Sequence, residues 1–371
     1  MRDFSHAMLR EIYEQPQALR RTLDLYVEGR QLRTAAWAGL DKWASTDGEV
    51  LIAASGSSRH SGLYAEIVLE DLCGLAVDVE YASELSCRGG SGGRNASVIV
   101  ISQSGETSDT LAALRESERR GEKTLAITNV AGSTMAREAT VSLLVGAGRE
   151  LAIPATKSFT GQLAVLYLLA LNEGLRRNHF NSAEVAERLG EFDKLPAQIE
   201  AQLEGWELSM ARLSHQLRSA ASFLFLGRGV HYPIAREGAL KLKEASYVHA
   251  EGYPSGELKH GPNALLSDDV PVVMLATVDH GLEASRARYE KTLQLLADLK
   301  VQGAKVIAIA NSGDNEVAAL ASECVFVEQV SEHLLPVVEV IPLQLFAYFM
   351  ALERGVNVDR PRNLAKAVIE V

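Results

Sequence analysis

The stretch that decides the fold spans residues 97–115 and reads Ser97-Val98-Ile99-Val100-Ile101, then Ser102-Gln103-Ser104-Gly105-Glu106-Thr107, then Ser108-Asp109-Thr110-Leu111-Ala112-Ala113-Leu114-Arg115. The first part predicts a buried strand and the last part a helix. The loop between them, with its hydroxyls, one amide and one glycine, therefore lies at the start of that helix. Free backbone N–H groups at that end favour an anion, and hydroxyls can donate to phosphate oxygens without adding charge. The loop therefore predicts a phosphate pocket. The alternative is an ordinary N-cap, for which one hydroxyl suffices.

Similar apolar runs surround this stretch. The first half of the chain has five predicted strands, at Val50–Ala54, Val77–Tyr81, Ser97–Ile101, Thr124–Asn129 and Val141–Val145. Continuous apolar strands between helices are typical of a parallel sheet covered on both faces, and ligands bind beyond the carboxyl ends of such strands. Ser55-Gly56-Ser57-Ser58 follows the first strand as Ser102–Thr107 follows the third, so both hydroxyl clusters are expected at that edge.

The second half repeats this order of strands. Its runs are Phe223–Leu226, Val270–Ala276, Val306–Asn311 and Val325–Val327. The spacing recurs over roughly 175 residues, which indicates a duplicated unit. We therefore predict an α/β fold with two tandem, flavodoxin-like parallel-sheet subdomains. The hydroxyl cluster does not recur, because Ala276-Thr277-Val278-Asp279 replaces it, so only the first half is expected to bind phosphate.

The predicted domains follow from these runs. Residues 1–45 are expected to be N-terminal helices, because apolar residues recur every three or four positions, with a break at Pro16. Residues 46–178 form the first subdomain, 179–218 a helical connector, 219–355 the second subdomain and 356–371 a C-terminal tail.

Composition restricts the class of protein. The 371 residues are 47% hydrophobic and carry a net charge of −11, which argues against nucleic acid or an anionic membrane as a partner. The three cysteines lack metal-ligand spacing, so we expect free thiols and no metal or other cofactor. The start has no apolar signal segment and no apolar run appears long enough to span a bilayer, so a cytoplasmic location is expected.

The residues richest in chemistry run from Tyr232 to Pro262. Glu237, Lys241 and Glu244 share one helical face at i, i+4 and i+7. Such a stripe is most often solvated, but small and apolar residues on the other faces favour burial, and a buried carboxylate suits proton transfer. His260 lies in a glycine-rich polar loop and is a better catalytic candidate than His249.

The C-terminal segment has no regular pattern and ends in a lysine-containing stretch around Lys366. The simple interpretation is a frayed tail. The alternative is that Lys366 forms a Schiff base with a sugar carbonyl.

The chain resembles the duplicated form of the sugar isomerase (SIS) fold, and more narrowly the isomerase half of the glucosamine-6-phosphate synthases (glutamine–fructose-6-phosphate aminotransferases). The resemblance covers nearly the whole chain. It rests on these blocks: Ser102–Thr107, Ala155-Thr156-Lys157-Ser158-Phe159-Thr160, Glu237–Glu244, Gly256-Glu257-Leu258-Lys259-His260-Gly261-Pro262 and Pro361-Arg362-Asn363-Leu364-Ala365-Lys366.

The resemblance implies roles by position. It implies that Glu244 moves a proton between C1 and C2 and that Lys366 forms the Schiff base. His260 opens the sugar ring and reaches in from the neighbouring subunit of a homodimer, and Lys241 and Glu237 support the site. The sugar-phosphate ligands are Ser57, Ser58, Ser102, Gln103, Ser104 and Thr107, with backbone contacts to the sugar from Ile153 and Ala365.

The sequence also departs from the family. The resemblance does not include a glutaminase domain with its N-terminal nucleophilic cysteine, and Pro154-Ala155 replaces the usual Ala-Ser. We therefore expect the reverse reaction, the isomerising deamination of glucosamine 6-phosphate to fructose 6-phosphate and ammonia. The alternatives are a phosphosugar aldose–ketose isomerase and an ammonia-dependent synthase. A sugar-phosphate sensor is a further alternative of another class, but Glu244, His260 and Lys366 are all retained.

Overall fold

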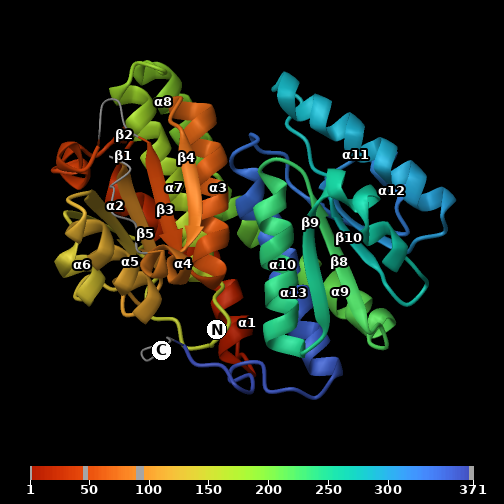
Figure 1. Cartoon of the computed structure of the whole chain (residues 1–371). Helices are drawn as coiled ribbons and strands as arrows, with labels where there is room; N and C mark the ends of the chain where they lie inside the picture. The colour runs from red at the N-terminus through yellow and green to blue at the C-terminus, as the bar shows by residue number, and fades with distance from the viewer. Residues whose placement is uncertain (1, 45–48, 89–95, 367–371) are drawn as a thin grey trace. The chain divides into compact units, whose positions relative to one another are not determined.

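The computed structural model describes residues 2–44, 49–88 and 96–366, and the chain divides into two compact units (Figure 1). Unit 1 comprises Met1–Tyr13, Leu151–Thr156 and Ala197–Leu364. Unit 2 comprises Glu14–Glu150, Lys157–Pro196 and Ala365–Val371. The predicted boundary at residues 45–46 and the end of the tail, 367–371, lie outside the described residues, and the domain bounds stay predictions.

Unit 2 is built on a sheet of five strands in the order β4-β3-β5-β6-β7, with every neighbouring pair parallel. The strands are β3 (Val50–Ala54), β4 (Val77–Tyr81), β5 (Ser97–Ser102), β6 (Lys123–Thr128) and β7 (Val141–Leu144). The helices are α2 (Gln15–Tyr26), α3 (Gly56–Cys73), α4 (Ala82–Cys87), α5 (Ser108–Arg119), α6 (Thr134–Glu138), α7 (Lys157–Arg176) and α8 (Ser182–Phe192). The chain leaves β3 toward β4 on one side and returns to β5 on the other, so the ligand-binding switch point of this topology lies between β3 and β5.

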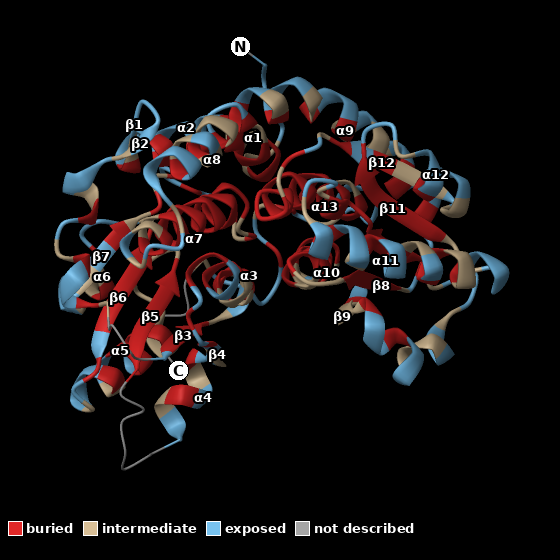
Figure 2. Cartoon of the chain, turned by 90° about the horizontal axis from the view of Figure 1, so that it is seen from above, coloured by how far each residue is buried: buried red, intermediate tan, exposed pale blue. Residues whose placement is uncertain are grey.

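Alternation along the strands explains how both faces of this sheet are buried (Figure 2). Leu51, Val98 and Val100 pack on one face in a cluster with apolar residues of α4 and α5. Ile52 points to the opposite face, where it approaches α3 at Gly62, and α3 packs against α7. Each fully buried aliphatic side chain contributes about 1.5–3 kcal/mol of transfer free energy. This burial on both faces holds the sheet in place. The loops that follow β3, β5 and β7 lie at the carboxyl ends of its strands.

Unit 1 repeats this sheet, in the order β9-β8-β10-β11-β12, again all parallel. The strands are β8 (Ser222–Gly227), β9 (His249–Pro254), β10 (Val272–Leu275), β11 (Val306–Asn311) and β12 (Glu323–Val327). The helices are α1 (Ala7–Tyr13), α9 (Leu195–Leu217), α10 (His231–Ser246), α11 (Glu283–Val301), α12 (Asn315–Leu320) and α13 (Leu335–Glu353), with the short 3₁₀ helices η3 (Ser255–His260) and η4 (Pro262–Leu265). The matching strand orders confirm the duplicated α/β fold.

Two local predictions were wrong. The segment read as a polar loop before His260 contains β9, an edge strand parallel to β8 whose polar residues are partly exposed. The N-terminal segment is helical only to Tyr26, after which a hairpin of β1 (Val27–Glu28) and β2 (Gln31–Leu32) leads into the 3₁₀ helices η1 (Thr34–Trp37) and η2 (Leu40–Lys42). In both places the strands are short and partly polar. Their sequences therefore lack the alternation of apolar and polar residues by which a strand is usually predicted.

Two expectations from composition had different outcomes. Cys73, Cys87 and Cys324 are free thiols, as expected, and burial raises the pKa of Cys73 to about 12. The expectation that no apolar run is long enough to span a bilayer was wrong, because α13 passes that test among the described residues. Within unit 1, however, 89% of its apolar window is buried, and a core helix passes the same test. Its packing partners include α10 and α1.

Candidate active site

The hydroxyl loop after β5 is folded back on itself by its own side chains. The hydroxyls of Ser102 and Thr107 lie 2.9 Å apart, and the Ser102 hydroxyl also accepts from the Gly105 N–H at 3.1 Å. The Ser104 hydroxyl accepts from the Glu106 N–H at 3.2 Å. Thr107 is the N-cap of α5, yet within the described residues its side chain makes no capping hydrogen bond. The ordinary N-cap alternative therefore does not explain these hydroxyls, two of which, those of Ser102 and Thr107, meet at the helix start.

The backbone of this loop is fixed by the next loop of the sheet. Gly105 has φ +66°, and a Cβ there would lie 2.2 Å from the hydroxyl of Ser133. The Glu106 carboxylate accepts from the Thr134 N–H at 2.7 Å, and the Gln103 carbonyl accepts from the Asn129 N–H at 3.1 Å. Only glycine combines this conformation with this close approach, so the loop is held before any ligand arrives.

The second hydroxyl cluster lies at the start of α3. Ser55 is the N-cap, and among the described residues its side chain does not cap the helix. Ser58 is buried and accepts a hydrogen bond from the Gln162 side-chain amide at 3.0 Å. Since β3 and β5 are adjacent parallel strands, this cluster and the Ser102–Thr107 loop flank the switch point of the same sheet.

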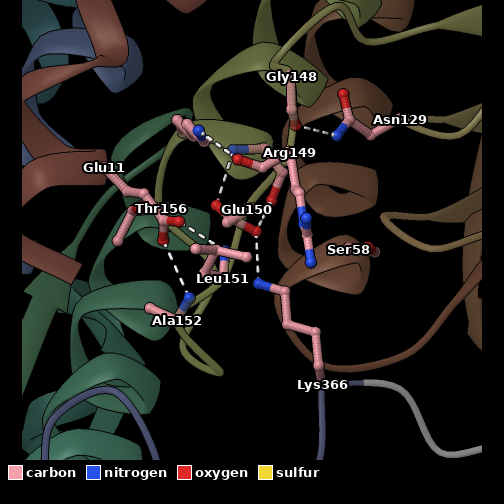
Figure 3. Close-up of polar contacts among 12 residues, drawn as sticks. Glu11, Ser58, Asn129, Gly148, Arg149, Glu150, Leu151, Ala152, Thr156 and Lys366 are labelled. Atoms are coloured by element: carbon pink, nitrogen blue, oxygen red, sulfur yellow. Dashed lines mark hydrogen bonds and ion pairs between the residues drawn. The ribbon is translucent and has the colours of Figure 1, made fainter. Parts of the chain in front are cut away.

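Lys366 is tied to the same unit by a buried carboxylate. Its Nζ lies 2.6 Å from Oε2 of Glu150, whose side chain is fully buried (Figure 3). Glu150 also accepts from Ser158 at the start of α7, from the hydroxyl at 2.7 Å and from the N–H at 3.1 Å. The frayed-tail interpretation is therefore wrong as far as residue 366.

The loop that carries Glu150 is itself anchored. The Asn129 amide donates to the Gly148 carbonyl at 2.7 Å (Figure 3). It also accepts from the Ala147 N–H at 2.9 Å. Lys157 donates to the Arg149 carbonyl at 2.6 Å. These bonds fix the three backbone residues directly before the glutamate and involve no atom of Lys366.

Helix α7 connects the lysine to the hydroxyl clusters. Ser158 and Gln162 are four residues apart and so lie on one face of the helix. Ser158 binds Glu150, and Gln162 binds Ser58. One rigid helix thus positions both the Lys366 partner and a predicted phosphate ligand.

In unit 1, α10 carries the charged stripe that the sequence predicted. Glu237 and Lys241 are 0% and 1% exposed, so the prediction of burial is confirmed and the solvated stripe is not. Lys241 Nζ lies 3.5 Å from Glu237 and also binds the Glu244 carboxylate. Glu244 retains 22% exposure of its side chain, which leaves its carboxylate accessible to a ligand.

The remaining predicted residues are more exposed. His260 is exposed at the end of η3, directly before Gly261 with φ +151°. The Ile153 N–H donates to the Asp359 carbonyl at 3.0 Å, and Ala365 is exposed beside Lys366. The predicted site residues thus fall in both units, with the phosphate ligands, Ala365 and Lys366 in unit 2 and the others in unit 1.

Sequence reasoning missed Glu150. It names neither this carboxylate nor its partners Ser158 and Gln162 as site residues. A signal was present, because Gly146-Ala147-Gly148 directly follows the predicted strand at 141–145, and both glycines have positive φ. A glycine-rich turn beyond a strand's carboxyl end was a reason to examine the glutamate after it.

Unit 1 holds a different set of side chains at the corresponding edge. Glu339 of α13 is fully buried and binds His231 at the start of α10 and Thr277 after β10. Glu332, also buried, binds Ser285 and Arg288 of α11. In these two clusters the protein's own carboxylates therefore engage the donors.

The comparison with known families matches this duplication. The model of the SIS domain matches twice, at residues 45–172 and 216–354. The chain belongs to the SIS-domain family. A glutamine–fructose-6-phosphate aminotransferase (isomerizing) of Chlorobaculum tepidum is 41% identical over 368 residues, and one of Thermus thermophilus is 42% identical over 365 residues. Each match covers 98% of this chain but only 58–59% of the relative, so the chain spans less than two thirds of their length.

Solved structures agree with the fold. The C-terminal domain of glucosamine-fructose-6-phosphate aminotransferase from Francisella tularensis is 33% identical, with a TM-score of 0.87, and the match covers 96% of this chain and 98% of that one. A glucosamine-6-phosphate deaminase from Thermotoga maritima has a TM-score of 0.70 over 98% of this chain and 99% of its own. At 22% identity the latter shows the fold alone.

Proposed function

We propose that this SIS-domain chain catalyses the isomerising deamination of glucosamine 6-phosphate, giving fructose 6-phosphate and ammonia. The observation that carries the proposal is the placement of Lys366 by Glu150 in the same unit as the two hydroxyl clusters. An amine nucleophile and neutral phosphate donors together suit a phosphorylated sugar with a reactive carbonyl. The named relatives act in the same chemical class.

The proposed reaction needs only groups that the chain supplies, and water. His260 assists ring opening, which gives the C1 aldehyde with the amine still on C2. Glu244 then moves a proton from C2 to C1 while a proton passes from the C2 nitrogen to O1, which leaves a hydroxymethyl group at C1 and an imine at C2. The Lys366 amine adds to C2 and expels ammonia, and water hydrolyses the new imine to fructose 6-phosphate and free lysine. Lys241 and Glu237 keep the Glu244 carboxylate oriented.

One assay tests the reaction and its direction. The purified chain is incubated with glucosamine 6-phosphate, and ammonia and fructose 6-phosphate are measured together; we expect equal amounts. Interconversion of fructose 6-phosphate and glucose 6-phosphate without ammonia would instead identify an aldose–ketose isomerase. The aminotransferase names of the 41–42% identical relatives favour a second candidate, synthesis from fructose 6-phosphate and ammonia, so the same assay is run in reverse.

We also propose that the chain is a cytoplasmic homodimer in which His260 completes the partner's site. The exposure of His260 on a short 3₁₀ helix supports this, because a catalytic histidine needs a substrate beside it. Activity per chain should then fall on dilution as dimers dissociate. Constant activity down to a monomer by light scattering would contradict the shared site.

A further inference from the structure

A cavity of about 290 Å³ lies at the edge of the unit 1 sheet. Its walls come from three segments: Arg228 directly follows β8, Ser255 directly follows β9, and Lys291 and Asp298 lie on α11. Lys259 of η3 completes it. In open parallel sheets, ligands bind outside the carboxyl ends of the strands, which is where this cavity lies.

The charge of the cavity is positive in an acidic protein. Three cationic side chains line it against one carboxylate, and Lys259 pairs with that carboxylate, Asp298, at 2.5 Å. The side chains of Arg228 and Lys291 have no carboxylate or hydrogen-bond partner within the described part of the chain. In a chain of net charge −11, two cations that face one cavity without a counter-charge are unusual.

The surroundings of Arg228 and Ser255 show that the cavity is a formed site rather than an open surface. The Arg228 guanidinium lies over Gly256, where a Cβ would come within 3.4 Å of Nη1, and its Nε is buried without a hydrogen-bond partner in the described structure. Ser255 is only 2% exposed, and its hydroxyl reaches no better acceptor than the Met274 sulfur at 3.9 Å. A buried hydroxyl normally has a stronger partner.

We propose that this cavity is a second anion site, which takes a small phosphomonoester or phosphate ion. The Arg228 guanidinium supplies a fork of N–H donors, Lys291 a point charge and Ser255 a neutral donor. The site differs from the hydroxyl loops of unit 2 in its chemistry, since it uses cations where those loops use hydroxyls. An anion bound here bridges β8, η3 and α11, and η3 is the segment that ends at His260. Its occupancy therefore orders the η3 segment.

The test uses inorganic phosphate as the probe and hydrogen exchange as the readout. Phosphate is added to the full chain at millimolar concentration, with potassium chloride at matched ionic strength as the reference. We expect slower exchange in residues 255–266. Lys291→Glu should weaken this protection at least about tenfold in phosphate concentration, since it replaces an attraction by a repulsion. Lys300→Glu is the matched control, because Lys300 lies on the same helix but donates to the Ala319 carbonyl, outside the cavity.

The outcomes separate this site from the proposed catalytic one. Equal protection in the Lys291→Glu variant, or protection confined to residues 102–107, would overturn the proposal. Slower exchange at 255–266 in wild type and Lys300→Glu, lost in Lys291→Glu, supports it. The result does not depend on turnover, so it stands even if glucosamine 6-phosphate releases no ammonia.

Discussion

Replacing Glu150 by glutamine tests how this unit holds its lysine. The substitution keeps the size and one carbonyl acceptor but removes the charge that faces Lys366 at 2.6 Å and accepts two bonds from Ser158. The position of the Lys366 amine should be lost while the predicted phosphate ligand Ser58 stays in place, because the Ser58–Gln162 bond is one helical turn away from the change.

The size of the effect follows from the burial of the pair. A hydrogen bond to a charged group contributes about 1.5–3 kcal/mol. Lys366 retains 26% exposure, so the lower part of that range applies. About 1.5–2 kcal/mol corresponds to roughly a 10- to 30-fold loss. We expect Schiff-base formation at Lys366 to fall by that factor, with the dissociation constant for glucosamine 6-phosphate changed less than about threefold.

The assay traps the imine. The chain is incubated with fructose 6-phosphate and borohydride, which reduces the imine to a stable secondary amine, and the modified Lys366 peptide is quantified by mass spectrometry. Glu173→Gln is the matched control, because Glu173 is another buried carboxylate of unit 2, paired with Arg176 at the far end of α7. Wild-type trapping in Glu150→Gln, or an equal loss in Glu173→Gln, would refute the positioning role.

Three further outcomes are expected. Gly105→Ala should weaken phosphosugar binding and lower the free energy of unfolding by more than about 2 kcal/mol, because the new methyl group would lie 2.2 Å from a serine hydroxyl. Calorimetry measures the binding and urea unfolding the stability. Unchanged values of both would contradict the close approach at Gly105. Glu244→Gln should abolish turnover but leave glucosamine 6-phosphate binding intact, and undiminished turnover would exclude Glu244 as the proton carrier. Burial lowers the pKa of His231, but the adjacent Glu339 and Glu332 carboxylates together outweigh it, so the net pKa is raised. This stabilisation is complete below the unfolded pKa of about 6.5 and is lost as pH rises through the folded pKa, at up to about 1.4 kcal/mol per pH unit. Urea unfolding should show that decline in wild type and not in Glu339→Gln.

Strong periodic signals predicted most of the fold. The runs at 50–54 and 306–311 match β3 and β11 to the residue, because a strand buried on both faces must be almost entirely apolar. The run at 77–81 also matches β4 to the residue, but β4 is an edge strand in which polar Asp78 and Glu80 alternate with apolar residues. The duplication followed from the spacing of those runs. The hydroxyl clusters were found for a related reason, since they interrupt the apolar pattern where a strand ends.

The parts that the sequence did not reveal depend on contacts between distant residues. Lys366 and Glu150 are 216 positions apart, and no local pattern links a lysine near the chain's end to a glutamate after β7. Strand β9 is an edge strand, so its polar composition resembles that of a loop, and only its pairing with β8 identifies it. The exposure of His260 likewise depends on how η3 packs, which its glycine-rich sequence does not specify.

The interleaving of the two units has a consequence for synthesis and for fragment design. Unit 2 takes its last described residues, including Lys366, from beyond the end of unit 1, and unit 1 takes its first helix from before the start of unit 2. The sheet and hydroxyl loops of unit 2 are therefore synthesised well before Lys366, the residue that pairs with Glu150, leaves the ribosome. No single cut in the chain separates the units cleanly. A protease nick after Leu364 would leave unit 1 whole and remove from unit 2 only the segment that carries the lysine.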